Sequence, residues 1–344
     1  MINVGIVGAT GYTGLVLMTC LLSHPQVQIT YLAANRSAGK AIADVFPHLS
    51  GANLPQNLVA FNAKDIPKLD VLFLALPHGA SHGVMADILN QDIGRIIDLS
   101  ADFRLNDANV YKSTYGMDHA LPDMLSKVPL GIPEIYRDDI RSARLVACPG
   151  CYSTSVIVGL YPLYHTGMTL DRVIVDSKSG VSGAGRQVSE ANLFCEVNEA
   201  VTAYKTGVHR HVPEMEMVLG DTPLFSPHLV PMMRGILSSC YITFSPTAPP
   251  IDPSHLQAAY QQVYEHAPFV TVTNLKNGSM PSTRWVVGSN RVHITIGQVS
   301  LHEWVVFSAI DNLVKGAAGQ AVQVLNVMNE WDETYGLQSI PRTI

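Results

Sequence analysis

Several features that define membrane, secreted or nucleic-acid-binding proteins are missing from this chain of 344 residues. No uninterrupted apolar run reaches the ~18 residues that a membrane-spanning helix needs. No charged segment followed by an apolar stretch resembles a signal peptide. The net charge of −6 offers no basic field to nucleic acid or to an anionic membrane. We therefore expect neither a membrane nor a nucleic acid as partner, and a small anionic ligand would need a local basic cluster.

Cysteine is also scarce, and its spacing does not form a disulfide framework. The chain has five cysteines, an odd and scattered set, which is typical of a reducing compartment and predicts a cytoplasmic protein. Charged residues make up only 15% of the chain and hydrophobic residues 47%, as in a well-packed globular protein. The length is sufficient for two domains or one large one.

The first 150 residues alternate predicted strands with helical segments. Residues 2–8 form a nearly continuous β-branched run, which is typical of a buried parallel strand. The alternation predicts an α/β fold with a doubly wound parallel sheet. The further strands that we expect are 28–33, 71–76, 95–99 and 145–147.

Beyond about residue 155 the pattern changes to strands separated by Pro-rich loops. This pattern predicts a second domain with a mixed or antiparallel sheet, whose expected strands are 173–177, 238–244, 269–272 and 291–298. The segment 312–329 is Ala-rich and amphipathic, so we expect a helix that returns to the first domain.

A glycine-rich turn follows the first strand. The G-x-x-G-x-x-G spacing is a variant of the dinucleotide fingerprint, in which glycines permit a tight turn and a close approach of the backbone to a pyrophosphate. An ordinary strand–helix turn is the alternative, but the strand before and the helix after it favour the dinucleotide site. The predicted cofactor-binding residues here are Gly8, Thr10, Gly11, Tyr12, Thr13 and Gly14.

The end of the second predicted strand favours NADP over NAD. NAD sites usually place a carboxylate there to hold the ribose hydroxyls. This chain instead has the sequence Ala-Ala-Asn-Arg-Ser over residues 33–37, so no carboxylate would repel a 2′-phosphate. Arg36 and Ser37 are the predicted ligands of that phosphate.

A Pro-Gly turn delivers Cys151 to the start of a helix-compatible run. Unpaired backbone N–H groups and the helix dipole favour a thiolate at such a position, and the same donors can hold an oxyanion. A nucleophilic sulfur combined with a hydride carrier predicts the interconversion of an acyl group and an aldehyde through a thioester. Cys148 and Cys151 also form a CxxC pair, for which a redox dithiol and half of a metal site are the alternatives. No second CxxC is present, and we expect no metal.

A nucleophilic thiol needs a nearby base that later acts as an acid. The segment 207–214 contains His209, Arg210, His211 and Glu214, and this carboxylate is a candidate to orient an imidazole. The residues alone do not separate the two histidines. The loop 176–186 is rich in glycine, hydroxyls and cations, which suits an anion or a nicotinamide, or else a flexible connection.

Taken together, the motifs resemble the N-acetyl-γ-glutamyl-phosphate reductase family of arginine biosynthesis nearly end to end. They are VGIVGATGYTG (4–14), DLSADFR (98–104), GIPEIYR (131–137), PGCYST (149–154), DSKSGVSGAGR (176–186), HRHVPE (209–214), PHLVPMMRGIL (227–237) and DNLVKGAAGQA (311–321). The family usually has Asn where this chain has Cys148. The resemblance implies the fold of glyceraldehyde-3-phosphate and aspartate-semialdehyde dehydrogenases: a Rossmann-type domain, 1–148 with a C-terminal helix at about 310–344, and an α+β catalytic and oligomerisation domain, 149–309.

The resemblance also implies roles for particular residues. Cys151 matches the family's nucleophile and His211, the second histidine of HRHxPE, its acid–base group. The resemblance implies a homodimer or homotetramer that uses NADP(H). Two alternative functions remain: a related reductase of another acyl phosphate (aspartyl or carrier-linked aminoadipyl phosphate), and a non-catalytic nucleotide sensor. Further cofactor contacts are expected from Pro77, Ser182, Gly183 and Asn312, and contacts to substrate or phosphate from Arg104, Lys178, Arg210 and Glu214, with Lys205 as a further candidate.

Overall fold

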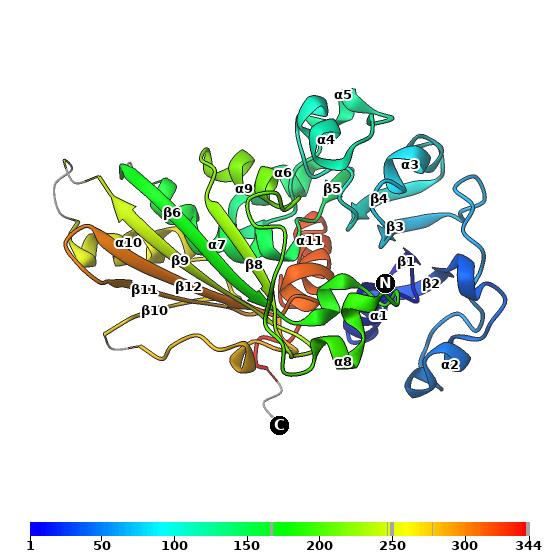
Figure 1. Cartoon of the computed structure of the whole chain (residues 1–344). Coiled ribbons are helices and arrows are strands. Elements are labelled where there is room, and N and C mark those ends of the chain that lie inside the picture. Colours follow the sequence, from blue (N-terminus) through cyan, green and yellow to red (C-terminus); the bar gives the residue numbers. More distant parts are fainter. Residues whose placement is uncertain (166–167, 246, 248–250, 277, 342–344) are drawn as a thin grey trace. The chain divides into compact units, whose positions relative to one another are not determined.

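The computed structural model describes residues 1–165, 168–245, 247, 251–276 and 278–341, which form two compact units (Figure 1). The first unit comprises Met1–Pro149 and Ala317–Leu337, and the second comprises Gly150–Gly316 with residues 338–341. The prediction assigns residues 310–316 to the first domain, whereas they cluster with the second unit. The reason is that Asp311 and Asn312 accept backbone hydrogen bonds from two turns of that unit, at Gly288 and Gly235.

The first unit is built on the predicted parallel sheet. Its strand order is β2-β1-β3-β4-β5 (Figure 1). The chain passes from β1 to β2 on one side and then crosses to β3, β4 and β5 on the other side of β1. Every pair in the sheet is parallel. The strands are β1 (Ile2–Val7), β2 (Val27–Ala33), β3 (Leu69–Leu74), β4 (Ile93–Asp98) and β5 (Leu145–Ala147).

Helices cover both faces of this sheet, because alternate side chains of its strands are apolar on each face. Met85 and Ile88 of α3 pack against one face. On the other face, Val324 of α11 and Val146 of β5 lie on either side of Gly131. The helical elements of the unit are α1 (Tyr12–Leu22), η1 (Asn35–Ser37), α2 (Ile42–Val45), η2 (Pro47–Leu49), α3 (Ser81–Leu89), α4 (Ala108–Tyr115), α5 (Pro122–Leu125), α6 (Pro133–Ser142) and α11 (Gly319–Met328).

The second unit contains a seven-stranded mixed sheet in the order β10-β11-β12-β9-β6-β8-β7. The pairs β10–β11 and β6–β8 are parallel and the other four are antiparallel. The strands are β6 (Leu170–Ser179), β7 (Thr202–Ala203), β8 (Leu224–Leu229), β9 (Ile236–Phe244), β10 (Val270–Asn274), β11 (Val292–Gln298) and β12 (Glu303–Ile310). The prediction of a mixed sheet is therefore confirmed.

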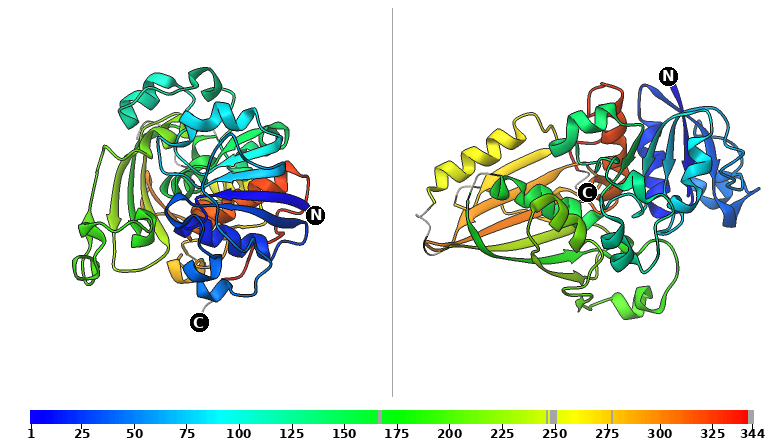
Figure 2. Two further views of the ribbon diagram at one scale, coloured as in Figure 1. Left: turned by 90° about the vertical axis from the view of Figure 1, so that its right-hand side faces the viewer. Right: turned by 90° about the horizontal axis from the view of Figure 1, so that it is seen from above.

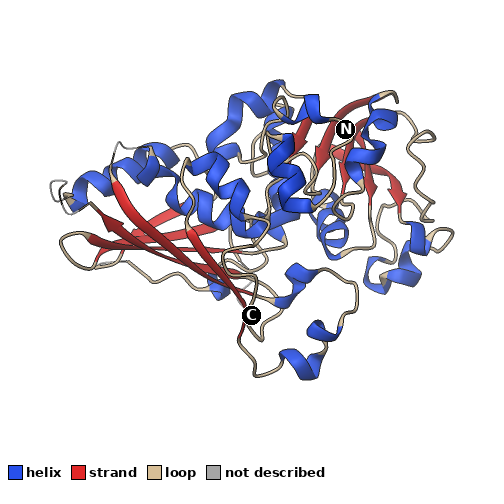
Figure 3. Cartoon of the chain, turned by 45° about the horizontal axis from the view of Figure 1, so that its top comes forward, coloured by secondary structure: helices blue, strands red, loops and turns tan. Residues whose placement is uncertain are grey.

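Helices α7 and α10 pack on one face of this sheet, α7 against β6, β9 and β12 and α10 against β10 and β11 (Figure 2, Figure 3). The face they cover carries the fully buried residues of each strand, such as Val175 of β6 and Val306 of β12. The helical elements are α7 (Cys151–Tyr164), η3 (Val181–Ala184), η4 (Glu190–Asn192), α8 (Phe194–Val197), α9 (Val212–Leu219), α10 (Pro253–Tyr264) and η5 (Thr283–Trp285), and the π-helix η6 (Val314–Ala318) precedes α11.

Three strands were missed by the sequence patterns. β8 contains Pro227, which argues against an interior strand, and only the two-residue β7 pairs with it on its other side. β12 is a short apolar run, for which periodicity does not distinguish a strand from a buried helix. The predicted helix over 312–329 is divided instead, because η6 closes its turn with a hydrogen bond from the Gly316 N–H to the Asp311 carbonyl. Within the described residues, no helix has both the length and the hydropathy that a bilayer crossing requires.

A buried carboxylate lies at the carboxyl end of β4, within the DLSADFR motif. Asp98 is fully buried and accepts hydrogen bonds from the Ser100 N–H (2.8 Å), the Ser100 hydroxyl (2.8 Å) and the Ser81 hydroxyl (2.7 Å). Burial raises the pKa of Asp98 to about 6, although these hydrogen bonds oppose the shift. The carboxylate next along the chain, Asp102, accepts the N–H groups of Ser81 and His82 at the start of α3.

We expect Asp98 to make the stability of the protein depend on pH. Its folded-state pKa lies above the unfolded value, so its stabilising contribution is full below pH 3.8 and is lost as the pH rises through about 6. Urea unfolding between pH 4.5 and 7.5 measures this effect. Relative to Asp98→Asn, which cannot titrate, the wild type should lose up to ~1.4 kcal/mol per pH unit below pH 6 and nothing further above pH 7. Parallel curves for the two proteins would contradict this expectation.

Candidate active site

Cys151 is the first residue of α7, and Gly150 is its N-cap. Gly150 makes no side-chain cap, and the Thr154 N–H bonds to the Gly150 carbonyl to begin the helix. The N–H groups of the first turn have no acceptor within the helix, so they stabilise negative charge beside the sulfur. The predicted position of the cysteine at a helix start is thus what the structure has.

His211 packs directly on the turn that precedes the cysteine. It is the N-cap of α9, and α7 and α9 are in contact. A Cβ atom added to Gly150 would lie 2.3 Å from His211 Nε2 and 2.5 Å from its Cε1. The ring therefore occupies the space that any other residue at position 150 would fill, and glycine is required there.

Glu214 joins the same two helices. Its side chain is fully buried in the first turn of α9, and Oε2 accepts the Gly150 N–H at 2.8 Å. The carboxylate thus holds the backbone immediately before Cys151. Sequence reasoning placed Glu214 near the imidazole or the substrate, but the spacing gave no sign of this bond to the nucleophile's turn.

A cavity of about 180 Å³ in the second unit brings the candidate nucleophile and the candidate base together. Cys151 and His211 both line it, with two cations, Lys205 and Arg210. Of the residues singled out in the sequence, Gly183 and His209 also line it. Ser179 and Ala184, which also line it, belong to the loop 176–186 that the sequence singled out without naming them as site residues, and Tyr152 belongs to the motif PGCYST. The remaining lining residues, Tyr204 and Leu229, were missed.

Gly316 of the π-helix lies close to the Cβ atom of Cys151. A Cβ atom at Gly316 would be 2.7 Å from the Cys151 Cβ. The π turn, closed by the bond from Gly316 to Asp311, sets this approach. Single π turns are frequent at functional sites. The motif DNLVKGAAGQA gave no indication that residues 314–318 form such a turn beside Cys151.

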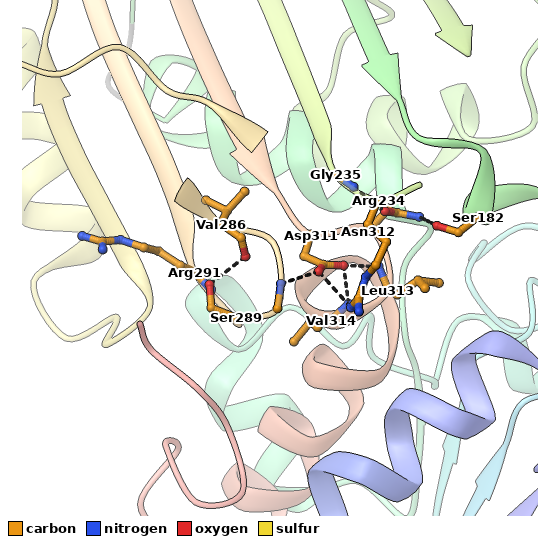
Figure 4. Close-up of polar contacts among 11 residues, drawn as sticks. Ser182, Arg234, Gly235, Val286, Ser289, Arg291, Asp311, Asn312, Leu313 and Val314 are labelled. Atoms are coloured by element: carbon orange, nitrogen blue, oxygen red, sulfur yellow. Dashed lines mark hydrogen bonds and ion pairs between the residues drawn. The ribbon is translucent and has the colours of Figure 1, made fainter. Parts of the chain in front are cut away.

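The pair Asp311–Asn312 holds the glycine-rich loop after β6 (Figure 4). The Asn312 amide accepts the Gly235 N–H (2.8 Å) and donates to the Ser182 hydroxyl (3.0 Å). Buried Asp311 accepts the N–H of Leu313 (2.8 Å) and is paired with Arg234 (2.9 Å). Ser182 and Asn312, both predicted to bind the cofactor, therefore bond to each other within the second unit and position the loop that carries Gly183.

Two of the cations predicted to bind phosphate are engaged elsewhere. Arg104 is buried in the first unit, where Nε donates to the Cys148 carbonyl (2.7 Å) and a terminal nitrogen to the Leu99 carbonyl (2.8 Å). Lys178 on β6 forms an ion pair with Asp176 and does not line the cavity. Arg210 and the further candidate Lys205 are the predicted phosphate residues that line the cavity.

The glycine-rich turn has the geometry of a dinucleotide cradle. Gly8 has φ +84°, and a Cβ there would lie 2.1 Å from the Ala75 carbonyl oxygen. A Cβ at Gly14 would lie 2.5 Å from the Gly8 carbonyl oxygen, so Gly14 lets α1 approach the turn. Gly11, the N-cap of α1, makes no side-chain cap, which leaves the first-turn N–H groups at Tyr12 and Thr13 for an anion.

Arg36 and Ser37 follow β2 at the same edge of the first sheet as this turn. The Gly8 and Ala9 N–H groups both bond to the Ala33 carbonyl, which joins the turn to the end of β2. Arg36 is exposed, and its guanidinium has no hydrogen bond or ion pair with any residue that the structure describes. Pro77 follows β3, and its carbonyl accepts the Ala80 N–H.

None of the five cysteines, all of which the structure describes, forms a disulfide, and this includes Cys148 and Cys151. Cys148 is buried, and its N–H donates to the Asp98 carbonyl (2.7 Å) in the first unit. Among the described residues, no three His, Cys, Asp or Glu side chains are grouped to hold a metal ion.

Known proteins match the chain over its whole length. A family model described as "Semialdehyde dehydrogenase, NAD binding domain" matches residues 3–143, and one described as "Semialdehyde dehydrogenase, dimerisation domain" matches 151–312. The N-acetyl-gamma-glutamyl-phosphate reductase of Ehrlichia chaffeensis is 44% identical, over 99% of this chain and 98% of its own. Those of Rhodospirillum rubrum and Cellvibrio japonicus are 45% and 43% identical over 99% of this chain and over 98% and 99% of theirs. The chain belongs to the N-acetyl-gamma-glutamyl-phosphate reductase family.

Solved structures place this reductase family member in a wider fold. Aspartate semialdehyde dehydrogenase II of Vibrio cholerae superposes with a TM-score of 0.70 at 19% identity, covering 96% of this chain and 98% of its own. The aspartate semialdehyde dehydrogenase of Candida albicans, solved with NADP, gives 0.70 at 16% identity with the same coverage. The predicted fold class, a Rossmann-type sheet with a second α+β unit of the semialdehyde dehydrogenase type, is confirmed.

We expect Gly150→Ala to displace the His211 ring. The added Cβ overlaps the imidazole, so unfolding free energy should fall by about 1–3 kcal/mol and alkylation of Cys151 by iodoacetamide should slow. Mass spectrometry of the Cys151 peptide separates this reaction from that of exposed Cys195. Gly83→Ala is the matched control, because no atom lies within 4 Å of its added Cβ. An unchanged alkylation rate in the Gly150 variant would show that His211 does not act on the thiol.

Proposed function

We propose that this chain reduces N-acetyl-γ-glutamyl phosphate to N-acetylglutamate 5-semialdehyde and phosphate with NADPH, a step of arginine biosynthesis. The observation that carries the proposal is the cavity that holds Cys151 at a helix N-terminus, His211 and two cations. Membership of the reductase family, at 40–45% identity over nearly the whole chain, supports the same reaction.

Cys151 is the proposed nucleophile. Its sulfur attacks the γ-carbonyl carbon, the C–O bond to phosphate breaks, and an acyl thioester on Cys151 forms as phosphate leaves. The N–H groups at the start of α7 stabilise the negative charge that develops on the carbonyl oxygen. A helix N-terminus therefore assists both the thiolate and the oxyanion.

His211 is the proposed acid–base group, because its ring packs on the residue before Cys151 in the same cavity. It accepts the thiol proton before attack. It returns this proton to the Cys151 sulfur as the thiohemiacetal collapses and the aldehyde is released. Glu214 acts by holding the Gly150 N–H, and so fixes the turn between nucleophile and base. Arg210 is the proposed phosphate ligand, since a guanidinium suits a dianion and this one lines the cavity.

The first unit fits NADP(H). The cradle at Gly8, Gly11 and Gly14 leaves room and N–H groups for the pyrophosphate, and Arg36 with Ser37 would hold the 2′-phosphate. NADPH, when bound, supplies the hydride that reduces the acyl carbon. Ser182, Gly183 and Asn312 form one hydrogen-bonded loop in the second unit, and we keep them, with Pro77, as proposed contacts of the nicotinamide end.

We further propose a homo-oligomer in the cytoplasm. The matched family model is described as a dimerisation domain, and the sheet face opposite α7 carries exposed or half-buried apolar side chains that suit a second copy. They are Ile174, Leu224, Leu237, Tyr241, Val305 and Phe307. The lack of a disulfide among the five described cysteines supports a reducing compartment.

We expect Cys151→Ser to abolish reductase activity while NADPH binding survives, because a serine hydroxyl is a much weaker nucleophile than a cysteine thiolate.

His211→Asn should lower kcat by roughly 10²–10⁴-fold, because the asparagine amide cannot accept or return the proton. Phosphate-dependent NADP⁺ reduction with N-acetylglutamate semialdehyde measures both, and fluorescence titration measures NADPH binding. Near-normal turnover by the serine variant would refute the covalent mechanism.

We expect Arg36→Ala to narrow the preference for NADPH over NADH. Loss of a charge-assisted bond to the 2′-phosphate should raise the KM for NADPH by roughly 10–100-fold and leave that for NADH nearly unchanged. Lys64→Ala, which removes another exposed cation of the first unit, is the control. An unchanged ratio of the two KM values would assign the phosphate to another group.

A further inference from the structure

The two histidines of the HRH segment differ in the role of their ring nitrogens. The backbone N–H of His211 donates to His209 Nδ1 at 3.1 Å. A nitrogen that accepts a backbone N–H must hold its lone pair there, so the proton of the neutral His209 ring is on Nε2. His209 is therefore fixed as a donor at Nε2.

The surroundings keep the His209 ring neutral and in place. Its ring centroid lies 5.5 Å from Tyr152, 5.7 Å from Tyr204 and 5.5 Å from Phe225, each in an edge-to-face arrangement. Burial, and then the charges of Arg210 and Lys205, lower the pKa of His209 to about 4. At neutral pH the ring is therefore mostly uncharged and a weak base toward the nearby thiol.

His209 lines the Cys151 cavity and carries one remaining ring proton, at Nε2. The residue lines that cavity, and Nε2 has no hydrogen-bond partner among the residues that the structure describes. A buried ring whose N–H has no protein acceptor at the wall of a cavity is suited to bind an oxygen of the substrate.

Lys205 lines the same cavity from an unusual backbone conformation. It has φ +49°, which L-residues other than glycine rarely adopt. The flanking chain holds it there, because the Tyr204 N–H bonds to Pro227 and the Gly207 N–H to Phe225, both on β8. Lys205 is exposed, and in the described part of the chain its ammonium has no ion pair and no hydrogen bond, so it is available to a ligand. The unusual backbone conformation beside a cavity favours a functional role for this residue.

We propose that the Lys205 ammonium and the His209 Nε2–H together bind the α-carboxylate of the acyl-phosphate substrate. This inference rests on the proposed function and assigns a subsite within it. One cation and one neutral donor match the two oxygens of a carboxylate monoanion, whereas the guanidinium of Arg210 suits the phosphate dianion. The carboxylate remains on the substrate after phosphate leaves, so this subsite holds the acyl chain through both chemical steps and selects for chain length.

The reverse reaction tests the assignment, because the carboxylate and the phosphate are then on separate molecules. In phosphate-dependent oxidation of N-acetylglutamate semialdehyde, Lys205→Met and His209→Asn should each raise the KM for the semialdehyde by roughly 10–100-fold. The KM for phosphate should stay within about twofold, as should the pKa values of the kcat profile. The asparagine oxygen of the His209 variant can still accept the His211 N–H, and Lys205→Arg should recover part of the loss.

Lys276→Ala, which removes an exposed cation outside the cavity, is the control and should change neither KM. A rise in the phosphate KM instead of the semialdehyde KM, or no rise in either, would overturn the carboxylate subsite. ¹⁵N NMR of the substrate-free protein is independent of activity: His209 should show an unprotonated Nδ1 and a protonated Nε2 from pH 6 to 8. A protonated Nδ1 would also overturn it. A wild-type protein without phosphate-dependent turnover would count against the proposed function, not against this tautomer.

Discussion

The hydrogen bond from the Gly150 N–H to the buried Glu214 carboxylate is the interaction on which the geometry of the site depends. A carboxylate with no exposed surface is costly unless charge and hydrogen bonds compensate it. Here it lies in the first turn of α9 and reaches the N-terminus of α7, so two positive helix ends stabilise one anion. The same bond fixes the positions of Cys151, which follows Gly150, and of His211, which is the N-cap of α9.

Two glycines, which have no side chain, allow the close packing around Cys151. Gly150 admits the His211 ring and Gly316 admits the Cys151 Cβ, and a methyl group at either position would lie within 2.7 Å of its neighbour. Gly150 and Gly316 also stand at two of the three points where the chain passes from one compact unit to the other, before Gly150 and after Gly316. The π turn places Gly316 against Cys151 at the second of these points.

Charge acts locally in this protein. The net charge of −6 opposes the approach of an anion at long range, but Lys205 and Arg210 line one small cavity. At short range such a pair outweighs the weak, screened field of the whole molecule. After burial, the same two cations lower the pKa of His209, so the charges proposed to attract the substrate also favour the neutral form of this ring.

How far the sequence predicts this site depends on whether a role is local. The parallel strands, the glycine cradle and the start of α7 follow from patterns of a few residues, and the structure has them where the patterns place them. Arg104 was predicted from its place at a strand end and a family resemblance, and Glu214 from its closeness in sequence to the two histidines. Each bonds to a backbone group distant in sequence, at Cys148 and Gly150, which no spacing encodes. The two histidines show the same limit, because they are two residues apart and alike in sequence. Only the folded chain makes one the acceptor of the other's N–H, and this bond decides which ring is available as a base.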